Sequence, residues 1–305
     1  MTLHELLETV RRVEIKTNRL VNDTMVGAYL SHFKGRGMDF EELRDYIPGD
    51  DVRDIDWNVT YRMGRPFIKR YREERELGML LAIDVSGSSA FGSVRRSKRE
   101  FAAEVAATLA FSAARSSDKV GLLLFTDQVE LYVPPRKGRR HILRLVRELL
   151  ACRPAHQGTD IPAALAFLNH VLHRRSIIFL LTDFLHSFEA ATTVPRSGPD
   201  LTQEIGATNA RHDLVCLHLH DPRESRLPPV GLLTVEDAET GELLELDSGR
   251  ETVRQTYADT NLERLADLDR ALTQAGVDTL RLDTAEPFAQ TLQRFFEMRR
   301  GRRRG

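Results

Sequence analysis

The chain has 305 residues, of which 41% are hydrophobic and 29% charged, and 44 Lys and Arg against 45 Asp and Glu give a net charge of -1. This length suits one large domain or a core domain with an extension, and the balanced charge excludes a global field that would attract nucleic acid or an acidic membrane. Because two cysteines are too few for a disulfide framework and the apolar runs fall far short of the ~20 residues that span a bilayer, we expect a cytoplasmic protein without a membrane span.

Residues 1–76 are predicted to form a short amphipathic helix followed by a charged extension. Apolar residues recur at helical spacing over Leu3–Val10, whereas residues 17–76 are dense in charge, contain several glycines and prolines, and show no sustained period. Within this irregular extension we expect one short helix near Glu41–Tyr46 and one strand near Pro66–Tyr71. Its aromatic residues predict that it packs on the core and is not disordered.

From residue 77 to residue 299, apolar strands alternate with amphipathic helices. Strands that are apolar throughout and separated by helices are typical of a mainly parallel sheet covered on both faces, which is a doubly wound α/β domain. An Arg-rich tail, residues 300–305, follows it and is expected to be a solvated terminus. The expected strands are 77–84, 119–126, 129–134, 176–183, 213–221 and 278–283, with a hairpin over 230–247; the expected helices are 97–116, 139–151, 161–173, 201–211, 251–275 and 287–299.

Oxygen-bearing side chains follow several of these strands. In an open parallel sheet ligands gather at the carboxyl ends of the strands, so these side chains are expected at one edge. Carboxylates and hydroxyls suit Mg²⁺, with Mn²⁺ and Ca²⁺ as neighbours, better than they suit zinc. The residues concerned are Asp84, Ser86 and Ser88 in a D-x-S-x-S spacing, Thr126 and Asp127, Thr159 and Asp160, Thr182 and Asp183, and Asp221.

A purely structural explanation exists for the same residues, because Asp and Ser are common in turns and helix caps that follow a strand. Enzyme motifs have less support. Ser86 does not lie in a G-x-S-x-G elbow, and the chain contains no G-x-x-x-x-G-K-[ST] phosphate loop. The Asp-rich stretch 49–58 does not fit the calcium-loop pattern, and we interpret it as a charged turn or a partner surface.

The arrangement over residues 77–299 resembles a von Willebrand factor A-type domain that carries a metal-ion-dependent adhesion site. That site has a D-x-S-x-S motif, a threonine from a second loop and an aspartate after the fourth strand. Thr126 competes with Thr159 for the threonine role, but Thr126 follows its strand directly, where the family pattern has none. By this resemblance the metal ligands are Asp84, Ser86, Ser88, Thr159 and Asp183.

The extension and the hairpin resemble a more specific family, the domain-of-unknown-function family 58 (DUF58). Residues 35–76 are similar to the segment that precedes the adhesion-type domain in that family, and LLTVEDAETGE at 232–242 and Phe91-Gly92-Ser93 fit it as well. A small departure is Ser89, where many members carry Met. This difference affects packing beside the site and leaves the ligands unchanged.

The resemblance implies a bacterial, non-enzymatic interaction module that binds Mg²⁺ and is the partner of a MoxR-type AAA+ ATPase in protein assembly or maturation. The open position of the metal would accept an acidic side chain from that ATPase or from a client protein. The alternative is an Mg²⁺- or Mn²⁺-dependent phosphoesterase or nuclease that uses the same oxygen cluster.

Overall fold

The computed structural model describes residues 3–20, 38–73, 78–94, 96–185 and 200–302. These group into two compact units, one formed by the N-terminal helix with the residues from 78 onward and the other by the charged extension. The remaining parts of the predicted extension and tail, residues 21–37, 74–77 and 303–305, lie outside the described residues.

The extension is built on an antiparallel strand pair. Strand β1 (Met38–Asp45) pairs with β2 (Phe67–Glu73), while a 3-10 turn η1 (Val52–Asp54) and helix α3 (Trp57–Met63) lie between them in the sequence. The strand expected near 66–71 is confirmed, but the helix expected near 41–46 is wrong. Residues 41–45 belong to β1, because pairing with a strand more than twenty residues away overrides a weak local propensity.

The Asp-rich stretch 49–58 is a turn whose acids have structural partners. Asp51 and Asp56 each accept hydrogen bonds from backbone amides at the start of the helical turn that follows. Asp50 accepts two hydrogen bonds from the Arg44 guanidinium, at 2.8 and 2.9 Å, and this pairing lowers the pKa of Asp50. The interpretation as a charged turn is therefore confirmed for these three acids.

The second unit contains a six-stranded sheet in the order β10-β7-β6-β3-β4-β5. Five strands run parallel, and the edge strand β5 is antiparallel to β4. Chain order starts at β3, moves outward to β5, and then returns to β6 on the other side of β3, which is a doubly wound topology with its switch point between β3 and β6. The strands are β3 (Gly78–Asp84), β4 (Lys119–Phe125), β5 (Val129–Arg136), β6 (Ile177–Thr182), β7 (Asp213–His220) and β10 (Asp278–Asp283).

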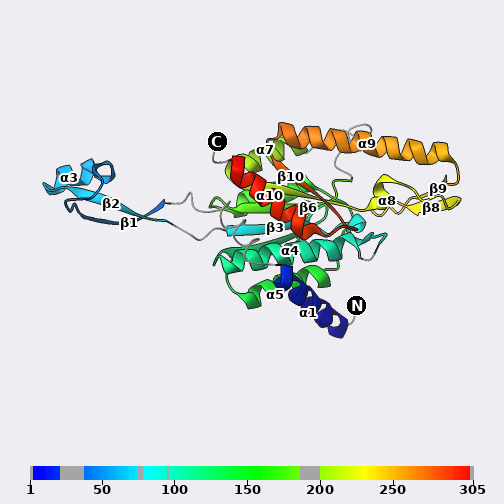
Figure 1. Ribbon diagram of the computed structural model, residues 1–305, viewed down its shortest axis with the longest axis horizontal. Helices are drawn as coiled ribbons and strands as arrows, with labels where there is room; N and C mark the ends of the chain where they lie inside the picture. The colour runs from blue at the N-terminus through cyan, green and yellow to red at the C-terminus, as the bar shows by residue number, and fades with distance from the viewer. Residues whose placement is uncertain (1–2, 21–37, 74–77, 95, 186–199, 303–305) are drawn as a thin grey trace. The chain divides into compact units, whose positions relative to one another are not determined.

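Helices cover both faces of this sheet, which confirms the predicted fold class. Figure 1 shows α4 and α5 on one side of the sheet and α7 and α9 on the other, and α1 packs against α4 and α5. The remaining elements are α1 (Leu3–Leu20), 3-10 turn η2 (Gly87–Ala90), α4 (Lys98–Arg115), α5 (Arg139–Ala151), α6 (Ile161–Val171), α7 (Leu201–Arg211), α8 (Pro222–Ser225), hairpin strands β8 (Leu232–Glu236) and β9 (Leu243–Asp247), α9 (Glu251–Gln274) and α10 (Phe288–Arg302). Among the described helices, none is long and apolar enough to cross a membrane.

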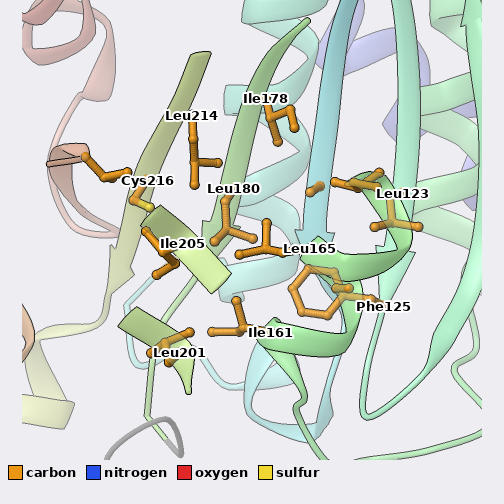
Figure 2. Close-up of a cluster of buried hydrophobic side chains, with 14 of the residues drawn as sticks. Leu123, Phe125, Ile161, Leu165, Ile178, Leu180, Leu201, Ile205, Leu214 and Cys216 are labelled. Atoms are coloured by element: carbon orange, nitrogen blue, oxygen red, sulfur yellow. The ribbon is translucent and has the colours of Figure 1, made fainter. Parts of the chain in front are cut away.

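Alternate residues of the central strands fill two cores. Leu80 and Ala82 of β3 belong to the cluster formed with α6, α7 and α9, part of which is shown in Figure 2. Met79, Leu81 and Ile83 therefore point to the opposite face, where α4 packs. All five are at most 2% exposed, and burying one large side chain of this kind is worth about 1.5–3 kcal/mol. This double burial fixes the positions of the strand ends.

The helix predicted over 287–299 is confirmed, and it extends into the first residues of the Arg-rich tail. Helix α10 continues to Arg302. Arg299, at 7% exposure, donates from Nη2 to Asp213 at 2.7 Å and from Nε to Asp278 at 2.6 Å. These bonds tie α10 to the first residues of β7 and β10, a role that the local sequence does not reveal because Asp213 lies far away along the chain.

We predict that His212 makes folding stability fall in mild acid. The ring is fully buried, its Nδ1 accepts a hydrogen bond from the Ser176 amide at 3.3 Å, and burial together with Arg211 lowers its pKa to about 4. Below pH 6.5 His212 binds a proton in the unfolded chain but stays neutral in the folded protein. The contribution of His212 to the free energy of unfolding is therefore lost as the pH falls towards 4. Between pH 7 and pH 5 the loss is about 2 kcal/mol.

The His212→Asn variant isolates this effect, because the Asn oxygen can accept the same amide hydrogen bond without titrating. Urea unfolding at pH 7 and pH 5 should show a smaller stability difference for the variant than for the wild type. Equal differences for the two proteins would contradict the assignment.

Candidate metal centre

The site lies where the loops after β3 and β6 diverge, at the switch point of the sheet. Asp84 ends β3, and its Oδ2 accepts a hydrogen bond from Thr182 Oγ1 of β6 at 2.7 Å. Its Oδ1 accepts the Ser86 backbone amide at 2.9 Å. Asp84 is 4% exposed, and its carboxylate is held by the neighbouring strand β6 and by the turn that follows β3.

The turn η2 brings the two serine hydroxyls of the D-x-S-x-S motif together. Ser86 Oγ and Ser88 Oγ are 3.1 Å apart, and Ser88 Oγ donates to Asp183 Oδ2 at 2.7 Å. Adjacent ligands of an octahedral Mg²⁺ ion with 2.0–2.1 Å bonds stand about 2.9 Å apart, which is close to the spacing of these hydroxyls. Hydrogen bonds thus connect four of the five predicted ligands, Asp84, Ser86, Ser88 and Asp183.

Thr159 lies in the loop before α6, and other residues of this loop contact the serine turn. The Gly87 amide donates to the Gln157 carbonyl at 2.9 Å, so this loop lies against the serine turn. The Thr159 hydroxyl donates to Glu239 Oε1 at 2.7 Å. Thr126, the competing threonine, donates instead to Glu130 Oε1 at 2.9 Å within its own hairpin.

A buried lysine that the sequence analysis missed borders the site. Lys98 lies in the first turn of α4, and its side chain is 1% exposed. Its Nζ donates to Asp183 Oδ2 and to Glu224 Oε1 of α8. No local sequence signal could have identified it, because these partners lie 85 and 126 residues away along the chain.

The electrostatics of this cluster are set by burial and by the short distance between its charges. Burial and the negative charge of Asp183 raise the pKa of Asp84 to about 6. Burial also opposes ionisation of Asp183, but the Lys98 ammonium outweighs it and lowers the Asp183 pKa. The Lys98 pKa is raised, since the attraction of Asp183 and Glu224 exceeds the effect of burial. When all are ionised, the carboxylates of Asp84, Asp183 and Glu224 face the Lys98 ammonium and the Arg99 guanidinium, which interacts electrostatically with Asp84, so one negative charge is in excess.

This donor set fits a hard divalent cation. Mg²⁺ or Mn²⁺ would neutralise the excess negative charge and bind the pair of buried hydroxyls, which stand at octahedral spacing. Among the described residues, no three His, Cys, Asp or Glu side chains are grouped so that they alone could hold a metal. A cation here would therefore take hydroxyl oxygens and water as ligands, which disfavours zinc.

Sequence comparison places the chain among proteins of one family. A family model described as "Protein of unknown function DUF58" matches residues 42–266, more than half of the chain. The chain is 29% identical over 299 residues to "Uncharacterized protein Rv1480" of Mycobacterium tuberculosis (strain ATCC 25618 / H37Rv). The alignment covers 97% of this chain and 90% of that protein. It is also 29% identical over 171 residues to "Uncharacterized protein MAV169" of Mycobacterium avium, covering 55% of this chain and 94% of that protein.

Solved structures show more distant similarities. The conserved hypothetical protein BatB from Bacteroides thetaiotaomicron aligns with 73% of this chain and 98% of its own, at 15% identity and a TM-score of 0.47. The VWA domain of SpRpn10 aligns with 71% of this chain and 93% of its own, at 10% identity and a TM-score of 0.38. Identities this low concern the fold and say nothing of function.

We predict that Lys98→Met destabilises the protein strongly. Without the ammonium, the Asp183 and Glu224 carboxylates are buried with no cation, and removing one partner of such a pair costs about 3–5 kcal/mol. The double variant Lys98→Met/Glu224→Gln should recover part of this loss, because one of the two buried charges is gone. Urea unfolding in EDTA measures the free energy of unfolding of the two variants. An equal loss of stability in the single and double variants would contradict the coupling between Lys98 and Glu224.

Proposed function

The chain belongs to the DUF58 family, and from this premise we propose that the edge of its sheet is a metal-dependent site that captures an acidic side chain of a partner protein. The observation that carries the proposal is the cluster of Asp84, Ser86, Ser88 and Asp183 at the switch point, buried and joined by hydrogen bonds. Two of these four side chains are neutral hydroxyls, which as ligands would leave a bound divalent cation electrophilic.

Each residue has a distinct role in this proposal. The hydroxyls of Ser86, Ser88 and Thr159 would be direct ligands, whereas Asp84 and Asp183 would hold the serine turn and the water ligands by hydrogen bonds. Mg²⁺, when bound, supplies a positive centre that attracts a carboxylate. Lys98 holds Asp183 in place from the side of α4 and α8, so the carboxylate orientation does not depend on the partner.

The partner that we propose is a MoxR-type AAA+ ATPase or one of its client proteins, with the site acting as an adaptor in protein assembly or maturation. The resemblance of the extension and of the D-x-S-x-S motif supports this partner. The geometry of the site supports the kind of group that the partner would contribute, which is an exposed carboxylate that can enter an oxygen-lined position beside the serine turn.

The alternative, a metal-dependent phosphoesterase or nuclease, needs a group that activates water. Asp84 has the raised pKa that such a base requires, but both of its oxygens already accept hydrogen bonds, from the Ser86 amide and the Thr182 hydroxyl. The Lys98 ammonium is 1% exposed and pairs with two carboxylates, so it is not available to bind a phosphate. These contacts favour binding over catalysis.

We predict that Mg²⁺ stabilises the wild-type protein and that Asp84→Ala abolishes the effect. At a Mg²⁺ concentration 100-fold above Kd the stabilisation is about 2.7 kcal/mol, which thermal unfolding detects and EDTA reverses. The matched control is Asp127→Ala, which removes an acid that is largely exposed at the end of the neighbouring strand and should retain the Mg²⁺ response.

The same three proteins test capture of the partner. A purified MoxR-type ATPase should be retained by the wild type and by Asp127→Ala in Mg²⁺, and lost with Asp84→Ala or EDTA. Capture that survives both Asp84→Ala and EDTA would contradict a metal-dependent mode of binding.

We also predict no turnover of generic phosphoester substrates in Mg²⁺ or Mn²⁺. A colorimetric phosphatase assay and a nuclease assay on plasmid DNA provide the measurement. Hydrolysis by the wild type that disappears in Asp84→Ala would favour the enzyme instead.

A further inference from the structure

The tip of the β8–β9 hairpin lies directly on the serine turn of the candidate metal centre. The carbonyl oxygen of Ala238 stands 2.0 Å from the position that a Cβ of residue 87 would occupy. Any side chain at Gly87 would therefore collide with the hairpin backbone, and the glycine is needed here for this close approach. Gly87 lies between Ser86 and Ser88, so the hairpin contacts the middle of the D-x-S-x-S motif.

Glu239, the next residue of the tip, reaches the second loop of the site. Its Oε1 accepts the hydrogen bond from the Thr159 hydroxyl at 2.7 Å, and its side chain is partly buried. Because the Gly87 amide also donates to Gln157 at 2.9 Å, the hairpin tip spans two loops that are themselves joined. A carboxylate of this chain is thus bonded to a hydroxyl that is a candidate metal ligand.

The turn is ordered in a way that holds Glu239 in this position. Asp237 Oδ1 accepts the amides of Glu239 and Thr240 at 2.8 and 3.0 Å, and the Gly241 amide donates to the Asp237 carbonyl at 2.8 Å. Gly241 has a φ of 74°, which closes the turn at little cost for a glycine. The tip is therefore preorganised and presents its carboxylate without a large loss of entropy.

The strands that carry this tip expose several of their side chains and bury none fully. Leu232 and Leu243, which begin β8 and β9, are 70% and 68% exposed, so little apolar burial holds these parts of the hairpin to the domain. An element with so few buried contacts opens at a low free-energy cost. Because no residue of β8 or β9 belongs to the buried apolar core, a movement of the hairpin would leave that core intact.

We propose that Glu239 is the internal acidic ligand of the metal centre and that a partner's carboxylate must displace it. The inference rests on the proposed function, since it gives Glu239 the position in the site that the partner's acid would take. An acid tethered on a short hairpin competes at an effective concentration of roughly millimolar or more. Weak acidic ligands would then be excluded, and a partner would bind only by outcompeting Glu239 or by moving the hairpin.

The test uses Mn²⁺ bound to the full chain and counts its water ligands by proton relaxivity. In Glu239→Ala a water should replace the carboxylate, so the relaxivity per bound Mn²⁺ should rise above that of the wild type. The Mn²⁺ affinity should fall roughly five- to tenfold through the loss of one charged ligand. The matched control is Glu242→Ala, which removes the same charge from an exposed position in the same turn and should leave both values within about twofold of the wild type.

The outcomes separate this inference from the proposed function. If Mn²⁺ binds and is lost in Asp84→Ala, but Glu239→Ala and Glu242→Ala give the wild-type relaxivity, the internal ligand is refuted and the metal site stands. If the wild type binds no Mn²⁺ that depends on Asp84, both ideas are refuted. A rise in relaxivity that is confined to Glu239→Ala supports both.

Discussion

Two buried carboxylates, Asp84 and Asp183, lie at the carboxyl ends of neighbouring strands of one sheet, and the need to neutralise them organises the rest of the site. Burial in a low-dielectric interior makes each charge costly, and burial together with the nearby charge of Asp183 raises the pKa of Asp84 to about 6. The Lys98 ammonium and the hydroxyls of Ser88 and Thr182 compensate part of that cost. One negative charge remains when Glu224 and Arg99 are also counted, and a divalent cation would compensate it.

The topology of the sheet determines where Asp84 and Asp183 come together. Because β3 and β6 are adjacent and the chain turns away from them in opposite directions, the loops that follow must separate and open a crevice at their carboxyl ends. Apolar side chains on both faces hold the two strands in place. Functional groups in the loops are thus carried by a rigid scaffold, while the β8–β9 hairpin beside the site contributes no side chain to the buried apolar core.

Those parts of this arrangement that depend on local pattern could be predicted from the sequence. Apolar strands and capped helices have periodic signatures, so the doubly wound sheet and the position of the D-x-S-x-S turn could be anticipated. What sequence reasoning missed depends on distant partners: β1 is a strand only because β2 pairs with it, Lys98 matters through Asp183 and Glu224, and Arg299 is buried by Asp213 and Asp278. Glu239 belongs to the same group, because a turn sequence does not show which surface it will contact.

The most direct test of a metal centre at this sheet edge is a crystal structure of the full chain grown in Mn²⁺, with anomalous differences measured at a wavelength that identifies the ion. We expect one strong peak about 2.1–2.2 Å from both Ser86 Oγ and Ser88 Oγ, with Asp84 and Asp183 within one water of it. A map at saturating Mn²⁺ with no anomalous peak beside the serine turn, and with Lys98 still paired to Asp183, would contradict the account.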